Sequence, residues 1–352
     1  MALDEEGNDR GDLIQDQTIV GSKRDSTEIN NEDEKKDKEE IPKSQDDQIL
    51  YVAKKPRWWR QLAGRRGTKG QRKAIARMVQ KGFVIPTKMG KYQYEINVSK
   101  LFECPPRGQP ITLDDILVPM VSDTNGQMRS NEICSLHQKK IALELGFGQG
   151  DNIVSNASKF PDKCFIGAEI HQPGVGVALM RMENAINDNT FWMEQTWVDE
   201  NDATTILTNK KKLQSSSLPY DNLRIFPGDG VKLLGFLPEN SIDEIYLTHP
   251  DPWPKEQDHH WRVIQEETVH LIGRVLKKSG RFYLATDAPV FDEWTVKIFE
   301  TVMGKAEPGT PKWKIIDPCP NRAQWLPVIS KYEGKGIEEG RATSTRCWEY
   351  LG

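Results

Sequence analysis

From residue 140 onward, short apolar runs alternate with longer stretches in which apolar residues recur at helical spacing. Short apolar runs bounded by glycine or polar turns are typical of buried strands, and the longer stretches are typical of helices. The predicted strands are 141–145, 164–168, 223–226, 242–247 and 281–286, with two further strand-like segments at 312–316 and 346–351. The predicted helices are 151–159, 174–187, 231–236, 262–278 and 290–303. This alternation predicts an α/β fold, with a mostly parallel, seven-stranded sheet and helices on both of its faces.

Composition divides the chain into three parts. Residues 1–50 contain 16 acidic and 7 basic residues and no aromatic residue, so segment 1–53 is predicted to be a disordered acidic tail. The rest of the chain holds 36 of the 52 acidic and 41 of the 48 basic residues, a balance of +5. Segment 54–139 is predicted to be a basic lead-in that contacts RNA, and segment 140–352 is the α/β domain. Residues 189–222 are polar and long for a connection, which indicates a surface insertion.

Eleven basic residues and no acidic residue lie within residues 54–81, and two adjacent tryptophans, Trp58 and Trp59, interrupt this run. Basic side chains interleaved with aromatic ones suit a phosphate backbone with unstacked bases. Thr68 is predicted to cap a helix over residues 69–80. The alternative is a solvated helix face, with the tryptophans packed into the core. The RNA-backbone contacts predicted from this run are Arg65, Arg66 and Lys69.

The cysteines and the apolar runs exclude several classes of protein. The five cysteines are scattered and form no Cys-x-x-Cys pair, so neither a disulfide framework nor a zinc site is predicted. His171 and His249 stand in no metal-ligand spacing, and no metal site is predicted. No apolar run approaches the ~20 residues of a membrane span, and the acidic N-terminus is unlike a transit peptide or a secretory signal. We therefore expect an intracellular protein of the cytoplasm, the nucleus or both, without membrane contact; an organelle stays open.

Acidic residues stand at the C-terminal ends of the predicted strands, where ligands bind in open α/β sheets. They are Glu144, Glu169, Asp229, Asp251 and Asp287. Asp251 lies between Pro250 and Pro252, and since proline fixes φ and lacks an N–H, its backbone is held rigidly. A rigid carboxylate beside the flat Trp253 suits a heterocycle that is gripped by its edge and its face. A proline-rich turn that only closes a strand is the alternative interpretation.

The glycine-rich segment Gly146-Phe-Gly-Gln-Gly150 follows the first predicted strand, and glycines there let a backbone approach a ligand closely. Glu169, which ends the second predicted strand, can bind both hydroxyls of a ribose. Loop and acid together fit either a dinucleotide or an adenosine cofactor, although the G-x-G-x-G spacing differs from the dinucleotide fingerprint. Asp229, in a turn between two glycines, lies at the same edge, where it can accept a hydrogen bond from an adenine amino group.

Four motifs closely resemble those of the tRNA (guanine-N7)-methyltransferases. These class I methyltransferases use S-adenosylmethionine and modify guanine 46 of the tRNA variable loop. The motifs are Glu144-Leu-Gly-Phe-Gly-Gln-Gly150, Gly167-Ala-Glu-Ile-His-Gln-Pro-Gly-Val-Gly176, Pro250-Asp-Pro-Trp-Pro-Lys255 and Ala285-Thr-Asp287. The likeness runs from about Arg65 to the C-terminus, and Gly67-Thr-Lys-Gly-Gln71 is similar to the basic N-terminal segment of the bacterial-type members. It implies a Rossmann-like class I methyltransferase domain over 140–352.

The resemblance also implies roles for individual residues. It places Asp251 at the catalytic position. It implies that the cofactor is bound by Glu144, Gly146, Gly148, Glu169, His171, Asp229 and Gly230. It implies that the substrate is bound by Lys255, Asp287 and the Thr-x-x-Glu-like segment Ser330, Lys331, Tyr332 and Glu333. Arg262 would join the RNA-backbone contacts, whereas Trp261 stands where the family usually has a further arginine, which puts one RNA contact in doubt.

These residues predict an enzyme that transfers a methyl group to guanine N7 in tRNA. Because N7 carries a lone pair and no proton, the reaction needs alignment rather than a base. Asp251 is predicted to hold the N1–H and N2–H₂ edge of guanine and to offset the charge that the ring gains. Trp253 either stacks on the guanine or belongs to the core. The alternatives are an exocyclic-amine RNA methyltransferase and a non-catalytic RNA-binding protein on the same fold; a dinucleotide oxidoreductase fits the glycine spacing least.

The expected partner is tRNA. Eukaryotic members of the family use a WD-repeat subunit, which stays an alternative here. The bacterial-like N-terminal segment favours a chain that acts alone.

Overall fold

The computed structural model describes residues 67–87, 94–103, 109–122, 128–130, 139–188, 190–198, 206–214, 219–305 and 309–352. The predicted tail, residues 1–53, and the predicted RNA contacts Arg65 and Arg66 lie outside these ranges. All described residues belong to Lys54–Gly352, the second of the two units into which the chain divides.

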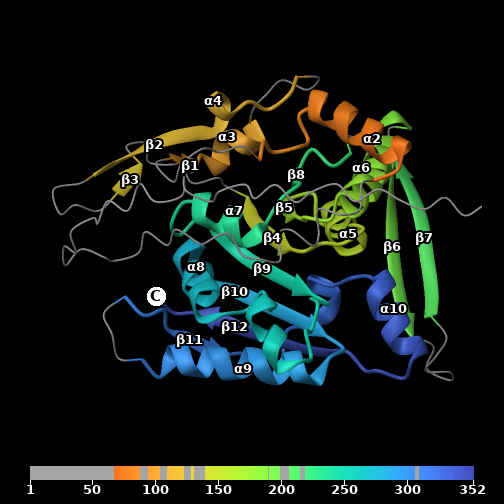
Figure 1. Ribbon diagram of the computed structural model, residues 1–352. Coiled ribbons are helices and arrows are strands. Elements are labelled where there is room, and N and C mark those ends of the chain that lie inside the picture. The colour runs from red at the N-terminus through yellow and green to blue at the C-terminus, as the bar shows by residue number, and fades with distance from the viewer. Residues whose placement is uncertain are drawn as a thin grey trace, which may run out of the picture. The chain divides into compact units, whose positions relative to one another are not determined.

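A seven-stranded sheet forms the centre of this unit, in the order β11-β12-β10-β9-β4-β5-β8 (Figure 1). Its strands are β4 (Lys140–Leu145), β5 (Lys163–Ala168), β8 (Leu223–Phe226), β9 (Ile242–Thr248), β10 (Leu276–Thr286), β11 (Trp313–Ile315) and β12 (Ser344–Tyr350). The first five are parallel, and β12 is antiparallel to both of its neighbours. The strand order reverses between β4 and β9, the position at which open α/β sheets bind ligands.

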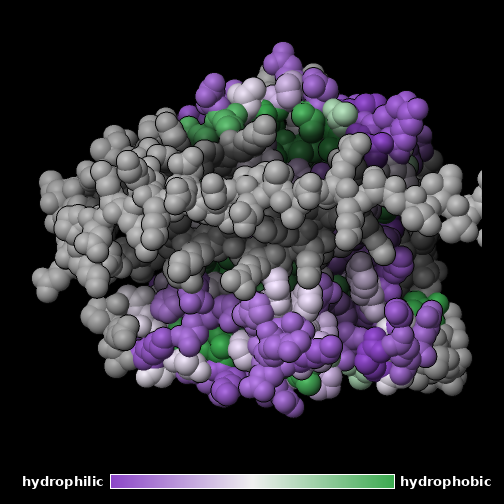
Figure 2. Space-filling view, in the orientation of Figure 1, coloured by the Kyte–Doolittle hydropathy of each residue, from purple (hydrophilic) through white to green (hydrophobic). Residues whose placement is uncertain are grey.

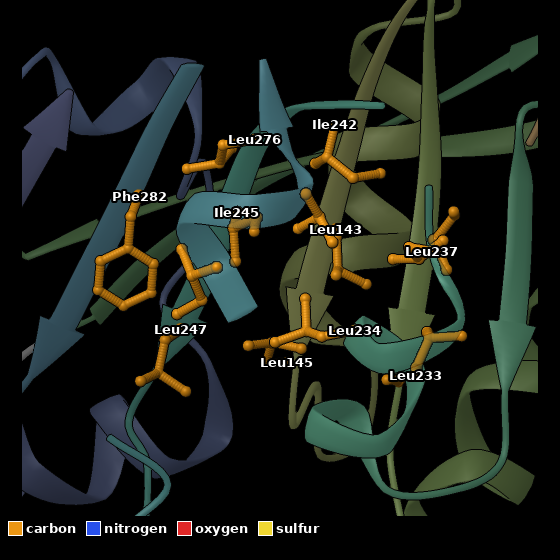
Figure 3. Close-up of a cluster of buried hydrophobic side chains, with 14 of the residues drawn as sticks. Leu143, Leu145, Leu233, Leu234, Leu237, Ile242, Ile245, Leu247, Leu276 and Phe282 are labelled. Carbon is orange, nitrogen blue, oxygen red and sulfur yellow. The ribbon is translucent and has the colours of Figure 1, made fainter. Parts of the chain in front are cut away.

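Helices cover both faces of the sheet, because alternate residues of each strand point to opposite sides. They are α5 (Asp151–Lys159), α6 (Gln172–Asn187), α7 (Gly230–Phe236), α8 (Glu266–Val275), α9 (Pro289–Met303) and α10 (Lys331–Glu338). In β4, Leu143 and Leu145 belong to the core that α7, α8 and α9 share (Figure 3). Ala142, which precedes Leu143, points to the other side and belongs to the core of α5 and α6. The predicted Rossmann-like class I methyltransferase fold is thus confirmed.

The described part of the lead-in packs on this fold. Helix α2 (Lys69–Gln80) begins with the predicted Thr68 cap, which is a full capping box. It packs along α6, where the Arg77 guanidinium bonds both oxygens of Glu183 at 2.7 and 2.6 Å (Figure 1). A small antiparallel sheet follows, formed by β1 (Tyr94–Ile96), β2 (Leu117–Ser122) and β3 (Met128–Ser130), with the short helices α3 (Val98–Glu103) and α4 (Leu113–Ile116). The boundaries predicted at residues 53 and 139 stay predictions.

The predicted insertion contains a two-stranded antiparallel ribbon of β6 (Thr190–Val198) and β7 (Ile206–Gln214). Strand β6 follows α6 closely along the chain. A Cβ added to Gly334 of α10 would stand 3.2 Å from Ile206 Cδ1, so β7 begins beside α10 (Figure 1). The ribbon therefore reaches from α6 to the helix that closes the carboxyl edge of the sheet.

The predicted helix over residues 262–278 is wrong at both ends. The chain first forms a 3₁₀ helix, η1 (Glu256–Trp261), and α8 begins only at Glu266. At the other end Leu276 pairs with Ile242, so β10 begins where the helical pattern was expected to continue. The register with β9 then shifts between Leu276 and Arg281.

The exposed sides of the covering helices are mainly polar. On the face seen in Figure 2, the surface over α9 and α10 is mainly hydrophilic. Helices with one apolar and one polar face are expected at the surface of a layered α/β domain.

The contact between α2 and α6 is tight enough to test by adding one methyl group. A Cβ on Gly176 of α6 would stand 2.5 Å from Gln71 Cβ and 3.2 Å from Gln71 Cα. We expect Gly176→Ala to lower the free energy of unfolding by about 1–3 kcal/mol, since overpacking forces the helices apart. The matched control is Gly70→Ala on the exposed side of α2, where an added Cβ would stand 3.9 Å from its nearest neighbour, Thr68 Oγ1. This variant should raise the free energy of unfolding by about 0.5 kcal/mol. Urea unfolding of both variants measures this, and equal stabilities would contradict the packing.

Candidate active site

The glycine-rich loop joins β4 to α5 at the carboxyl edge of the sheet. Gly146, Gly148 and Gly150 have φ of +72°, +59° and +81°, a region that residues with a side chain rarely adopt. Helix α6 fixes the loop from one side, since a Cβ on Gly174 would stand 2.2 Å from the Gly148 carbonyl oxygen. The other side is open, because a Cβ on Gly146 would meet no atom within 4 Å. The loop is therefore an open backbone cradle before a helix, as an adenosine-type ligand requires.

Glu144 lies beneath this cradle and is fully buried. Its carboxyl group accepts hydrogen bonds from Asn152 Nδ2 at 3.3 Å and from Thr248 Oγ1 at 3.0 Å. Burial raises the pKa of Glu144 to about 8, and the two hydrogen bonds oppose that shift. Glu144 thus ties the start of α5 to the end of β9 and supports the cradle from within.

Glu169 follows β5 and holds the glycine loop against the start of α6. Its carboxylate accepts hydrogen bonds from the Gly148 N–H at 2.7 Å and from the His171 N–H at 2.6 Å. His171 is the N-cap residue of α6, so its backbone orients the carboxylate. A carboxylate offers about four lone-pair positions, so the Glu169 carboxylate keeps acceptor capacity beside its bonds to the backbone N–H groups. The ribose contact predicted from the sequence is compatible with this geometry.

Asp229 and Gly230 form the start of α7. Asp229 Oδ1 accepts hydrogen bonds from the Val231 N–H at 2.9 Å and the Lys232 N–H at 3.4 Å. A Cβ on Gly230 would stand 2.8 Å from Leu145 Cδ2, so glycine lets α7 begin close against β4. Oδ1 serves the cap, and Oδ2 is therefore the atom that a contact with an adenine amino group would use.

Asp251 follows β9 in a loop with two strained backbone positions. His249 and Trp253 have φ of +47° and +42°, which is unfavourable for residues with a side chain. The His249 N–H donates to the Ala285 carbonyl at 2.7 Å and so fixes the loop to β10. The Asp251 side chain is exposed, although nearby protein atoms that displace water raise its pKa above the ordinary value of an aspartate.

Arg262 holds the other end of this loop. Its side chain is buried, and Nε and Nη2 donate to the carbonyls of Pro252 and Trp253 at 2.9 and 3.0 Å. The guanidinium also lies over the Trp294 ring, 4.9 Å from its centroid. This position corrects the predicted contact of Arg262 with the RNA backbone, because its donors face the loop that presents Asp251.

The acidic groups influence one another across the edge of the sheet. Burial is the main reason that the pKa of Glu169 is raised, and the Asp251 carboxylate adds to it. Burial likewise raises the pKa of Tyr332, with contributions from Glu169, Asp251 and Asp151. Charges act on one another in this way only over short distances. Asp251, Glu169 and Tyr332 therefore lie near one another at this edge of the sheet. Their shared role at one site stays a prediction.

Glu333 stabilises the start of α10 from inside the protein. Ser330 caps this helix by accepting a hydrogen bond from the Glu333 N–H at 3.2 Å. The Glu333 side chain is 2% exposed and forms a bidentate ion pair with Arg322, with Nη2 at 2.6 Å. It also accepts a hydrogen bond from Thr343 Oγ1 at 3.0 Å. These partners correct the predicted substrate contact of Glu333: its carboxylate shapes the site instead.

Lys331 and Tyr332 connect α10 to the start of α5 and to the glycine loop. The Lys331 N–H donates to Asp151 Oδ2 at 3.1 Å, which fastens α10 to the start of α5. Tyr332 is 53% exposed, and its Cε2 would stand 3.1 Å from a Cβ on Gly148. The tyrosine ring therefore lies directly on the cradle.

Lys255 and Asp287 were both predicted to bind substrate, and the structure gives the two side chains different surroundings. Lys255 is exposed at the end of the Asp251 loop. The Asp287 carboxylate pairs with Arg341 Nε at 2.8 Å and packs on Gly336 of α10. Lys255 is thus open to a ligand, whereas Asp287 already has a cationic partner.

Several residues that hold the site were missed in the sequence. They are Asp151, Asn152, Thr248, Arg322 and Arg341. Asp151, Thr248 and Arg341 bond predicted residues that lie 180, 104 and 54 positions away, which no local pattern reveals. Asn152 and Arg322 lie 8 and 11 positions from their partners, but neither spacing forms a motif. Only Asp151 gave a signal, as an acidic residue in the first turn of a predicted helix.

Among the described residues, no group of three or more His, Cys, Asp or Glu is placed to hold a metal ion. The helices within those residues are all too short or too polar to cross a membrane.

Comparison with known proteins decides the family. A family model described as "Putative methyltransferase" matches residues 138–345, more than half of the chain. Three similar curated proteins are tRNA (guanine-N(7)-)-methyltransferases. That of Azorhizobium caulinodans is 31% identical over 160 residues, which are 45% of this chain and 54% of the relative. That of Alcanivorax borkumensis is 30% identical over 210 residues, which are 59% of this chain and 70% of the relative. That of Photobacterium profundum is 29% identical over 235 residues, which are 66% of this chain and 80% of the relative. The chain belongs to the tRNA (guanine-N7)-methyltransferase family.

Membership confirms the resemblance found in the sequence and the cofactor that it implied, S-adenosylmethionine. The chain spans about half the length of the first relative and 80% of the third. The open cradle at Gly146 and the acceptor positions on Glu169 fit this cofactor.

Glu144 gives this methyltransferase a stability that depends on pH. Folding raises the Glu144 pKa from 4.5 to about 8, so the folded chain keeps a proton that the unfolded chain loses. Stability should therefore fall as the pH rises from about 4.5 through about 8. Between pH 5.5 and 8.5, we expect the free energy of unfolding of Glu144→Gln to rise relative to that of wild type by on the order of 3 kcal/mol. Urea unfolding at both pH values measures this, with the exposed Glu300→Gln as control; parallel pH profiles would contradict the buried proton.

Substitutions of Arg262 and Lys69 should have different effects on the salt dependence of tRNA binding. Arg262→Lys loses the forked donor that bonds two carbonyls, so we expect methyl transfer to tRNA to slow about tenfold. The slope of log Kd for tRNA against log salt concentration should stay unchanged. Lys69→Gln, at the exposed start of α2, should make that slope shallower by about 1. A shallower slope for Arg262→Lys would restore the RNA contact that the structure argues against.

Proposed function

We propose that this methyltransferase transfers the methyl group of S-adenosylmethionine to N7 of guanine in tRNA, at position 46 of the variable loop. The observation that carries the proposal is the exposed, rigidly held Asp251 carboxylate, within electrostatic reach of Glu169 at the glycine cradle. A cofactor loop and a carboxylate suited to a guanine edge thus share one site. The printed names of the bacterial relatives support the same reaction.

Alignment is the main task of the protein in this reaction. S-adenosylmethionine, when bound, supplies an electrophilic methyl group. Guanine N7 attacks with its lone pair and releases no proton, so holding the reactants in line contributes roughly 7–11 kcal/mol at best. The Asp251 carboxylate accepts hydrogen bonds from the N1–H and N2–H₂ donors of guanine, a pair that adenine lacks. As the methyl group arrives, the ring gains positive charge, which the same carboxylate stabilises.

The cofactor contacts of the proposal divide into direct and supporting ones. The proposed direct contacts are the backbone of Gly146 and Gly148, the Glu169 carboxylate and Asp229 Oδ2. Glu144, beneath the loop, His171, behind Glu169, and Gly230, at the start of α7, keep those groups in place.

The RNA contacts divide in the same way. Lys255 and Tyr332 are exposed and would meet the substrate. Ser330, Lys331, Glu333 and Asp287 hold α10 at the edge of the sheet. Lys69, with Arg65 and Arg66 outside the described residues, would contact the RNA backbone. The guanine has to leave its stack to reach Asp251, at a cost of a few kcal/mol.

The setting of the reaction is part of the proposal. The relatives are bacterial, which favours an enzyme that acts in the cytoplasm without a WD-repeat subunit.

Asp251 can be tested by removing its charge while keeping its shape. Asp251→Asn turns an amide towards guanine donors, and we expect the rate of methyl transfer to fall by about 100-fold or more. The control is Glu256→Gln, an exposed carboxylate in the next turn of the chain, which should stay within about twofold of wild type. Transfer of labelled methyl to a tRNA transcript measures both. Full activity of Asp251→Asn would remove Asp251 from the catalytic position.

A further inference from the structure

Trp253 and Trp261 form a stacked pair outside the apolar cores. Their ring centroids lie 5.9 Å apart at an interplanar angle of 29°, and the exposed His260 lies 4.7 Å from Trp261. Both indoles are partly exposed. Within the described residues, neither ring belongs to or packs against the two core clusters. The alternative that Trp253 is a core residue is therefore not supported.

The loop beneath holds this pair in a fixed position. Arg262 bonds the Trp253 carbonyl at 3.0 Å, and Gln265 Nε2 bonds the carbonyls of His259 and Arg262 at 2.9 and 3.0 Å. The His259 ring packs on Trp294 of α9, with centroids 5.2 Å apart. These bonds maintain the strained φ of +42° at Trp253. The two indoles are thus a rigid aromatic surface rather than a loose loop tip.

The charge around the pair disfavours binding by phosphate contact alone. Residues 255–261 contain Lys255, Glu256 and Asp258, so their net charge is −1 with neutral histidines. Trp261 itself stands where the family resemblance leads one to expect an arginine. A loop of this charge is a poor clamp for phosphates. Aromatic faces, in contrast, bind the faces of nucleobases without needing charge.

We propose that Trp253 and Trp261 form a stacking subsite for an unstacked nucleotide of the bound tRNA, next to the target guanine. The proposal rests on the proposed function. Trp253 is two residues from Asp251, so a base held there adjoins the one that Asp251 grips. When the target leaves its stack, its neighbour loses a stacking partner, and the indoles replace it. Lys255, exposed beside the pair, is placed for the phosphate of that nucleotide.

Three substitutions of Trp261 test the subsite in the full-length chain with a tRNA transcript. Trp261→Ala should raise KM for tRNA about 5- to 100-fold, with kcat within about twofold, because stacking holds the neighbour and not the reacting base. Trp261→Phe should keep most of the affinity. Trp261→Arg should recover affinity at low salt only, with a salt slope of log KM that is steeper by about 1. Trp261→Ala should leave that slope unchanged.

The control is Ile315→Ala, an exposed apolar residue on the edge strand β11, and it should match wild type. An unchanged KM in Trp261→Ala would overturn the subsite, and so would equal losses in the Ala and Phe variants. A lower kcat at constant KM would also overturn it and make Trp261 a positioning residue. In each case a wild type that still forms N7-methylguanine keeps the proposed function, whereas a wild type that forms none removes both.

Discussion

The two hydrogen bonds from buried Arg262 to the carbonyls of Pro252 and Trp253 are the constraint on which the site depends. The loop contains two left-handed residues, His249 and Trp253, each of which costs about 1–3 kcal/mol. Hydrogen bonds from a charged donor contribute about 1.5–3 kcal/mol, so the guanidinium offsets that strain. The consequence is a carboxylate, Asp251, that is exposed but not mobile. Alignment catalysis requires this combination.

The second constraint is the crowding of negative groups at one edge. Burial raises the pKa of Glu144 to about 8, so this group is mostly protonated at neutral pH, while Glu169 accepts hydrogen bonds from the backbone N–H groups of Gly148 and His171. Asp251 and Asp151 add further negative potential around Tyr332. Such an edge suits a cofactor and a transition state that carry positive charge. It also explains why the RNA-binding lysines and arginines are expected on the lead-in rather than among these acids.

The sequence predicted the features that depend on local pattern. Five parallel strands could be predicted because each contains a buried apolar run. Glu169 and Asp251 were predicted because acids end those strands, and their roles stay predictions. Pairing across the chain could not be predicted: Arg262 looked like a phosphate ligand and Glu333 like a substrate ligand, until their burial showed internal partners. The β6–β7 ribbon was predicted only as an insertion, because the pairing of its two strands is not visible in a local pattern. The predicted helix extends beyond the end of α8, because Lys277 and Lys278 suit a helix as well as a strand.

Nucleoside analysis of tRNA methylated by the purified full-length chain tests most directly whether this edge aligns N7. Digestion followed by mass spectrometry separates N7-methylguanosine from N2-methylguanosine. The proposed geometry, in which Asp251 grips the N1 and N2 edge of guanine and N7 faces the cofactor, predicts N7-methylguanosine at a single position, guanine 46. N2-methylguanosine, or methylation of adenine, would contradict that geometry.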